Sequence, residues 1–167
     1  MTRTRLTKLA CALALAIGGL IGPAAASAAN PVVVDFPAGL ACAGFDLRVQ
    51  ITGSSNVFRA FHDKDGNIVR TLLAGRGSAL TFVNLSTMSS LSLKANGAVV
   101  HTRFNQDGTQ TVKATGHVVI FLFPTDVPAG PSTTLHVGRV EYTVDADGVF
   151  TIQRVSGRTT DLCAALA

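Results

Sequence analysis

The chain has 167 residues, with 14 lysine and arginine residues against 10 aspartate and glutamate residues, and it has no tryptophan. This length is enough for one domain. Arg3, Arg5 and Lys8 belong to an N-terminal leader, so the rest of the chain has 11 basic and 10 acidic residues, a balance that argues against binding to nucleic acid or a membrane surface.

The leader, residues 1–28, has the pattern of a secretory signal peptide. Basic residues come first, an apolar run from Leu9 to Ile21 follows, and Ala26-Ser27-Ala28 forms a cleavage motif. The alternative is a retained membrane anchor, but a spanning helix needs about 20 apolar residues and this run is shorter. We therefore expect a single domain at residues 29–167 that works outside the cell or in the cell wall, with no membrane contact after cleavage.

Two cysteines remain after the leader, Cys42 near the start of the domain and Cys163 near its end. Two cysteines in an exported chain most simply form one disulfide. A lipid-anchored Cys42 is the alternative, but this residue lies well beyond the apolar run. A metal-binding or catalytic thiol has no support, because the chain has no Cys-x-x-Cys motif.

The domain consists of short segments that favour β-strands, separated by turns. Asp65-Gly66, Asn96-Gly97, Asp107-Gly108 and Asp147-Gly148 are tight-turn pairs that predict hairpins. No segment after the leader has the periodicity of a helix, and the last residues, from Gly157 to Ala167, read as a tail. The expected strands are 32–36, 45–52, 57–62, 67–73, 79–85, 91–95, 98–104, 109–115, 118–123, 135–144 and 149–155.

These connections predict an all-β fold in which neighbours in sequence pair as an antiparallel meander. A meander of about ten strands has two exposed edges, which closure into a β-barrel would remove. The positions of Cys42 and Cys163 favour closure, since a barrel places its first and last strands side by side. A β-sandwich is the alternative.

The stretch from His117 to Val144 differs from the other hairpins. Val118 to Phe123 is apolar without alternation, so we expect both of its faces to be covered. A loop with three prolines follows, from Pro124 to Thr134. In the next strand the apolar positions change parity, and a bulge near Gly138-Arg139 would restore the inward face.

Residues that could carry chemistry are few. Asp126 lies in the proline-rich loop, and His117, His136 and Arg139 lie on the two strands beside it. His117 and His136 could approach each other across these strands, or Arg139 could lie nearer to His117, depending on the register. None of them forms a recognised motif, so the sequence predicts no catalytic residue, no metal site and no cofactor. The Asp-rich turns lack the distant glutamate of a calcium loop, so they read as hairpin turns.

Four segments resemble those of small exported proteins of unknown function from actinobacteria. This resemblance covers nearly all of the chain after the leader. It implies an extracellular bacterial protein, and it transfers no activity and no catalytic residues. The segments are Phe36 to Cys42, Gly77 to Phe82, Leu122 to Thr134 and Thr160 to Cys163.

Three functions remain open on the sequence. The preferred one is a non-enzymatic domain that binds a small apolar ligand inside the barrel. The second is a structural or interaction protein of the cell exterior, which uses the loop at 124–134 to contact a protein partner. The third is a cyclase or isomerase that works in the barrel cavity with Asp126 or His117.

Overall fold

The computed structural model describes residues 30–167, which form one antiparallel sheet of eight strands and one short helix. The predicted all-β, antiparallel fold is confirmed. The predicted signal peptide at residues 1–28 lies outside the described residues. The elements are β1 Val32–Phe36, β2 Leu47–His62, β3 Ile68–Asn84, β4 Ser90–Leu93, β5 Ala98–Phe104, β6 Gln110–Leu122, β7 Ser132–Val144, β8 Phe150–Asp161 and α1 Leu162–Leu166.

Three of the predicted hairpin turns join neighbouring strands, and an aspartate organises each of the turns at Asp63 and Asp145. The carboxylate of Asp63 accepts hydrogen bonds from the backbone amides of Asp65 and Asn67, both at 2.9 Å. Asp145 accepts the equivalent pair in the β7–β8 turn. These aspartate side chains therefore stabilise the turns by accepting hydrogen bonds from backbone amides of the same turn, as expected for hairpin turns.

Several predicted strand breaks are absent, because long strands run through them. β2 and β3 have 16 and 17 residues and continue past the glycines at which the sequence predicted turns. The predicted hairpin at Asn96-Gly97 is also wrong. β4 and β5 pair with different parts of β3, β4 with 80–83 and β5 with 70–75, so Asn96-Gly97 connects two strands that follow one another along the same neighbour. The sheet therefore has eight strands and not about ten.

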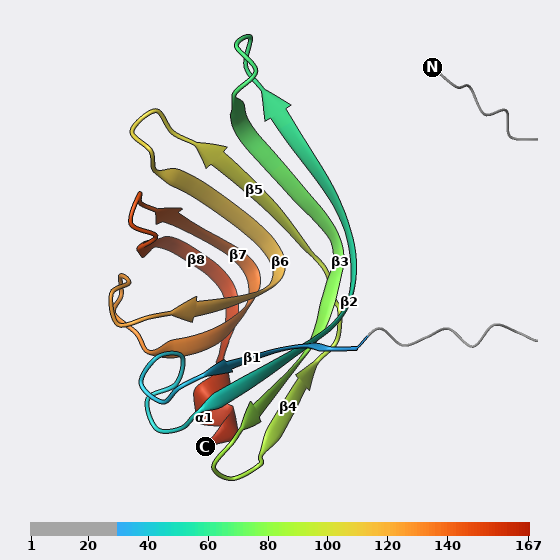
Figure 1. Cartoon of the computed structure of the whole chain (residues 1–167), viewed down its shortest axis with the longest axis vertical. Helices are drawn as coiled ribbons and strands as arrows, with labels where there is room; N and C mark the ends of the chain where they lie inside the picture. The colour runs from blue at the N-terminus through green and yellow to red at the C-terminus, as the bar shows by residue number, and fades with distance from the viewer. Residues whose placement is uncertain (1–29) are drawn as a thin grey trace, which may run out of the picture.

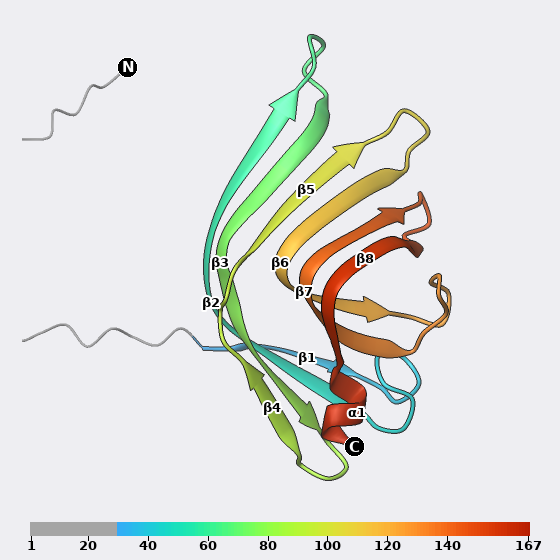
Figure 2. The same ribbon diagram turned by 180° about the vertical axis from the view of Figure 1, so that it is seen from behind.

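Five glycines form a line across the sheet, which we call the glycine crease: Gly75, Gly97, Gly116, Gly138 and Gly157. Gly138 pairs with Gly116 on one side and with Gly157 on the other. All five have positive φ, and at each of them an added Cβ would lie within 3 Å of a backbone oxygen of the neighbouring segment of the chain. The strands bend sharply along their length, so that the sheet curls into the open shape that Figures 1 and 2 show.

The crease gives the sheet two apolar cores on opposite faces. The first lies between the start of β2, the end of β3, parts of β6 and β7, and α1. It includes Leu47, Phe82, Leu162 and Leu166. The second lies inside the curve of β6–β8 and includes Ala114, Ile120, Leu122 and Val140.

Val118 to Phe123 contributes to both cores. Phe121 packs on the first and Ile120 belongs to the second, so the prediction that both faces are covered is confirmed. The predicted bulge at Gly138-Arg139 is wrong. β7 keeps its register there, and its register shift against β8 lies between Glu141 and Tyr142. The apolar parity changes because Leu135 packs on the first core before the crease, whereas Val140 and Tyr142 pack in the second core after it.

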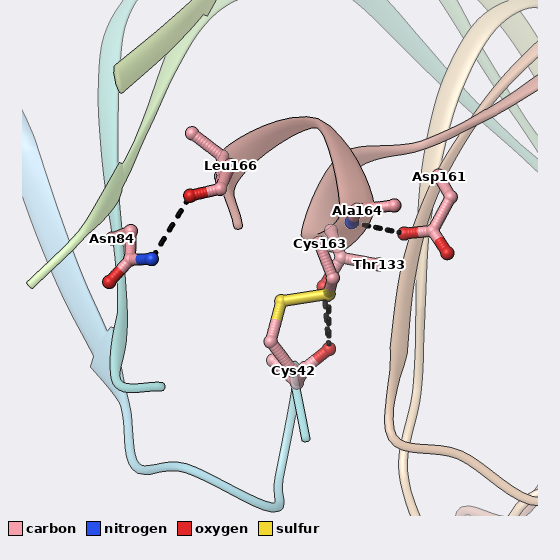
Figure 3. The surroundings of a disulfide bond; sticks show 8 residues. Cys42, Asn84, Thr133, Asp161, Cys163, Ala164 and Leu166 are labelled. Carbon is pink, nitrogen blue, oxygen red and sulfur yellow. Dashed lines mark hydrogen bonds between the residues drawn. A yellow bond between two sulfur atoms is a disulfide. The ribbon is translucent and has the colours of Figure 1, made fainter. Parts of the chain in front are cut away.

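The sheet is not closed by hydrogen bonds, and the predicted barrel is not confirmed. Within residues 30–167, β1 and β8 are the two ends of the strand order. The predicted disulfide between Cys42 and Cys163 is present and has a Cα–Cα distance of 5.6 Å. It links the β1–β2 connection to α1, as Figure 3 shows.

The predicted C-terminal tail is wrong, because the chain continues as β8 to Asp161 and then forms α1. Asp161 caps this helix by accepting a hydrogen bond from the amide of Ala164 at 3.0 Å. Asn84 donates to the carbonyl of Leu166 at 3.0 Å, and Thr133 donates to the carbonyl of Ala41 at 2.9 Å (Figure 3). Among residues 30–167, no helix is long and apolar enough to cross a membrane.

Candidate functional site

A pocket of about 640 Å³ lies between two walls of the curled sheet, on the face of the first core. Ile51, Leu80 and Leu93 are register partners across β2, β3 and β4 and line one wall. Val119 and Leu135 are register partners on β6 and β7 and line the other. These five side chains are half-buried, so the pocket has apolar surface on both walls. Figure 1 shows β8 descending to α1 opposite β3 and β4.

The next row of the second wall is polar at both ends. His117, Val137 and Arg158 are register partners across β6, β7 and β8, and all three line the pocket. Register partners of an antiparallel sheet point to the same face, so His117 and Arg158 flank Val137 on the pocket side. Arg76 and Lys94 also line the pocket, from β3 and from the end of β4. The pocket therefore combines half-buried apolar rows with exposed basic side chains.

Asp126, the acid of the proline-rich loop, has an internal structural role. It is 4% exposed, and its two carboxylate oxygens accept hydrogen bonds from the amides of Phe123 at 2.6 Å and Phe150 at 2.8 Å. The adjacent Val127 exchanges two backbone hydrogen bonds with β8, both of 2.7 Å, which fold the loop back on the start of that strand. Asp126 thus stabilises the conformation of the loop, and both of its carboxylate oxygens accept backbone hydrogen bonds.

His136 lies on the face opposite the pocket. It is 8% exposed, lies beside the second core, and lines a cavity of about 230 Å³ together with Ile120, Leu122 and Ile152. Its Nδ1 atom is buried and has no hydrogen-bond partner among the described residues. Burial lowers the pKa of this imidazole below its usual value of 6.5. The neutral form of His136 is therefore favoured in the folded protein.

His117 and His136 do not meet, although they lie on paired strands. His117 pairs with Val137, and His136 pairs with Val118, so the two side chains point to opposite faces. Arg139 lies beyond Gly138 and forms an ion pair with Glu141 at 2.5 Å. Of the four predicted residues, only His117 lines the pocket between the two sheet walls. Among the described residues no three His, Cys, Asp or Glu side chains gather to hold a metal ion.

The basic residues of the pocket were not predicted from the sequence. Arg76 follows Gly75 in what reads as a turn, and Arg158 lies in what reads as a tail, whereas both line the pocket from strands. No sequence motif joins these residues to Lys94 and His117. They come together only because β3, β4, β6 and β8 form the two walls. The signal that would have found them is the continuous strand register across the crease.

Comparison of the chain with protein-family models, with curated proteins and with solved structures gives no match.

Proposed function

We propose that the protein is an exported, non-enzymatic binding protein that holds a small apolar molecule in the pocket between its two sheet walls. The observation that carries the proposal is the pair of apolar rows, one containing Leu80 and the other Leu135, that line one pocket of about 640 Å³. Ligand sites are typically concave, mostly apolar and roughly 300–1,000 Å³ in volume. The pocket of the curled, open sheet would then hold the ligand that was expected inside a closed barrel.

Two features of the chain support this reading. The leader at residues 1–28 and the disulfide between Cys42 and Cys163 fit an extracellular setting. The loop at 124–134, the partner surface of the alternative hypothesis, has less support because its acid, Asp126, is used within the fold.

The enzyme hypothesis has less support too. His117 lines the pocket together with Ser78, Thr159 and Thr160, but none of the described lining residues is an Asp or Glu that would orient the imidazole as a general base.

A tryptophan that fills the pocket tests the proposal. Ser78 lines the pocket and is half-buried, so Ser78→Trp should block it. Ser92 on β4 is exposed and does not line the pocket, which makes Ser92→Trp a matched control. We expect saturable binding of a neutral apolar fluorophore to the wild type and the control, and a loss of at least about tenfold in affinity for Ser78→Trp. Equal binding by both variants would place the ligand elsewhere.

A further inference from the structure

Basic side chains gather at the pocket although the chain as a whole is nearly balanced in charge. The part of the chain after the leader has 11 basic and 10 acidic residues. Arg76, Lys94 and Arg158 line the pocket together with His117, and no described acidic residue lines it. A cleft that carries one sign of charge between low-dielectric walls concentrates the electric field and attracts ligands of the opposite sign.

These basic groups are free to meet a ligand. The ion pairs among residues 30–167 involve Arg48, Lys113 and Arg139, none of which lines the pocket. Arg76, Lys94 and Arg158 therefore have no acidic partner within the described part of the chain. An anion would gain charge-assisted hydrogen bonds from them without breaking an existing pair.

Burial separates the charged part of the pocket from its apolar part. The side chains of Arg76, Lys94, His117 and Arg158 are exposed, whereas the rows that contain Leu80 and Leu135 are half-buried against the first core. A bound molecule would therefore meet charge at the solvent side and apolar surface further in. A ligand with one charged end and one apolar end satisfies both parts.

We propose that the pocket selects a small amphipathic anion, with a carboxylate or phosphate head group between Arg76 and Lys94 on one wall and His117 and Arg158 on the other, and with an apolar tail along the Leu80 and Leu135 rows. This inference rests on the proposed function and names its ligand class. The head-group contacts add affinity to the burial of the tail, because guanidinium groups bind carboxylates and phosphates in a matched geometry.

The test compares ligands that share a tail and differ in the head group. Dodecanoate, dodecyl phosphate and dodecanol are titrated into the disulfide-bonded protein, residues 29–167, by displacement of a neutral fluorophore. We expect at least one of the two anions to bind about tenfold or more tightly than dodecanol. Added salt should reduce this preference, because the basic groups are exposed.

Charge variants locate the head group. Arg76→Gln with Arg158→Gln should abolish the preference for the anions, so that dodecanoate and dodecyl phosphate bind no more than about twofold more tightly than dodecanol. Arg59→Gln with Arg103→Gln removes the same charge from exposed positions that do not line this pocket, and should keep the preference. Circular dichroism verifies that both variants fold.

The outcomes separate the two proposals. Equal binding of dodecanol and both anions, or a preference that survives in the pocket variant, overturns the inference and leaves the apolar binding function standing. If none of the three ligands binds to the wild type, the proposed function fails and the inference fails with it.

Discussion

His136 is an ionisable group that the fold buries with no hydrogen-bond partner for its Nδ1 atom among residues 30–167. Its Nδ1 atom is buried beside the second core, and burial lowers the pKa of the imidazole. The unfolded chain regains an ordinary imidazole, with a pKa near 6.5. Between the lowered pKa and this value, the unfolded state binds more protons than the folded state. Stability must therefore fall as the pH falls through this window, and it is unaffected by His136 above it.

Replacement of His136 by leucine tests whether this histidine makes the stability fall as the pH falls. In the wild type the free energy of unfolding should decrease from about pH 7.5 to about pH 5.5, with a contribution from His136 of at most about 1.4 kcal/mol per pH unit. His136→Leu should remove this contribution, because it removes the group that titrates. Urea unfolding at both pH values measures the difference, with His62→Gln at an exposed position as the control. An unchanged pH dependence in His136→Leu would contradict the prediction.

At the scale of the strands, the glycine crease decides the shape of the sheet. An added Cβ at Gly138 would lie 2.3 Å from the carbonyl oxygen of Ser156 and 3.0 Å from the Cα of Gly157. Both neighbours are backbone atoms of β8, so neither can move without disturbing the β7–β8 pairing. The residue also has a φ of 144°, which L side chains rarely adopt. Strand separation and backbone conformation thus both require glycine.

Gly138→Ala should lower the free energy of unfolding by about 3 kcal/mol or more, because the added methyl group would both crowd the backbone of β8 and strain the backbone of residue 138. Two controls separate the causes. Gly108→Ala has positive φ and open space, and should cost about 1–2 kcal/mol. Gly44→Ala has open space and no positive φ, and should stay within about 0.5 kcal/mol of the wild type. Urea denaturation of the three variants gives the order. If Gly138→Ala lost no more than Gly108→Ala, close strand approach would not be the cause.

The same glycines explain why local turns were predicted well and strand lengths were not. Asp65-Gly66, Asp107-Gly108 and Asp147-Gly148 are defined by adjacent residues, so a local pattern identifies them. Gly75 and Gly157 look like breaks in sequence, and only their place in the register shows that strands continue through them. The β propensity of glycine indicates that a strand is weakened there, but hydrogen-bonded pairing with the neighbouring strands determines whether the strand continues.

Helix α1 was missed for a related reason. A helix of five residues lacks a periodic pattern, and its stability comes from packing. Leu162 and Leu166 are buried against the first core, where Leu47 and Phe82 also lie. The charged part of the candidate pocket was likewise not predicted, because Arg76 and Arg158 are far apart in the chain and line one pocket only through the curl of the sheet.

At the scale of the whole molecule, the two ends of the sheet are joined covalently and not by strand pairing. β1 and β8 end the strand order, while Cys42 and Cys163 bring the first connection and the last helix together. Thr133 adds a hydrogen bond from β7 to the carbonyl of Ala41, next to Cys42. The cysteine positions thus correctly predicted the disulfide, but they did not imply that the edge strands pair. A cross-link between a loop and a helix satisfies the same distance requirement as a closed barrel.

The cross-link should therefore carry a large part of the stability. It spans 121 residues of sequence, and a loop of this length is worth about 4–5 kcal/mol in the chain-entropy model. Cys42→Ser with Cys163→Ser should lose about this amount in urea unfolding, and reduction of the wild type should give the same loss. Because α1 would lose its covalent link and keep the packing of Leu162 and Leu166 and the hydrogen bond from Asn84, its amides should exchange with solvent faster than those of β6 and β7. A loss below about 1 kcal/mol would show that the first core keeps the two ends together without the disulfide.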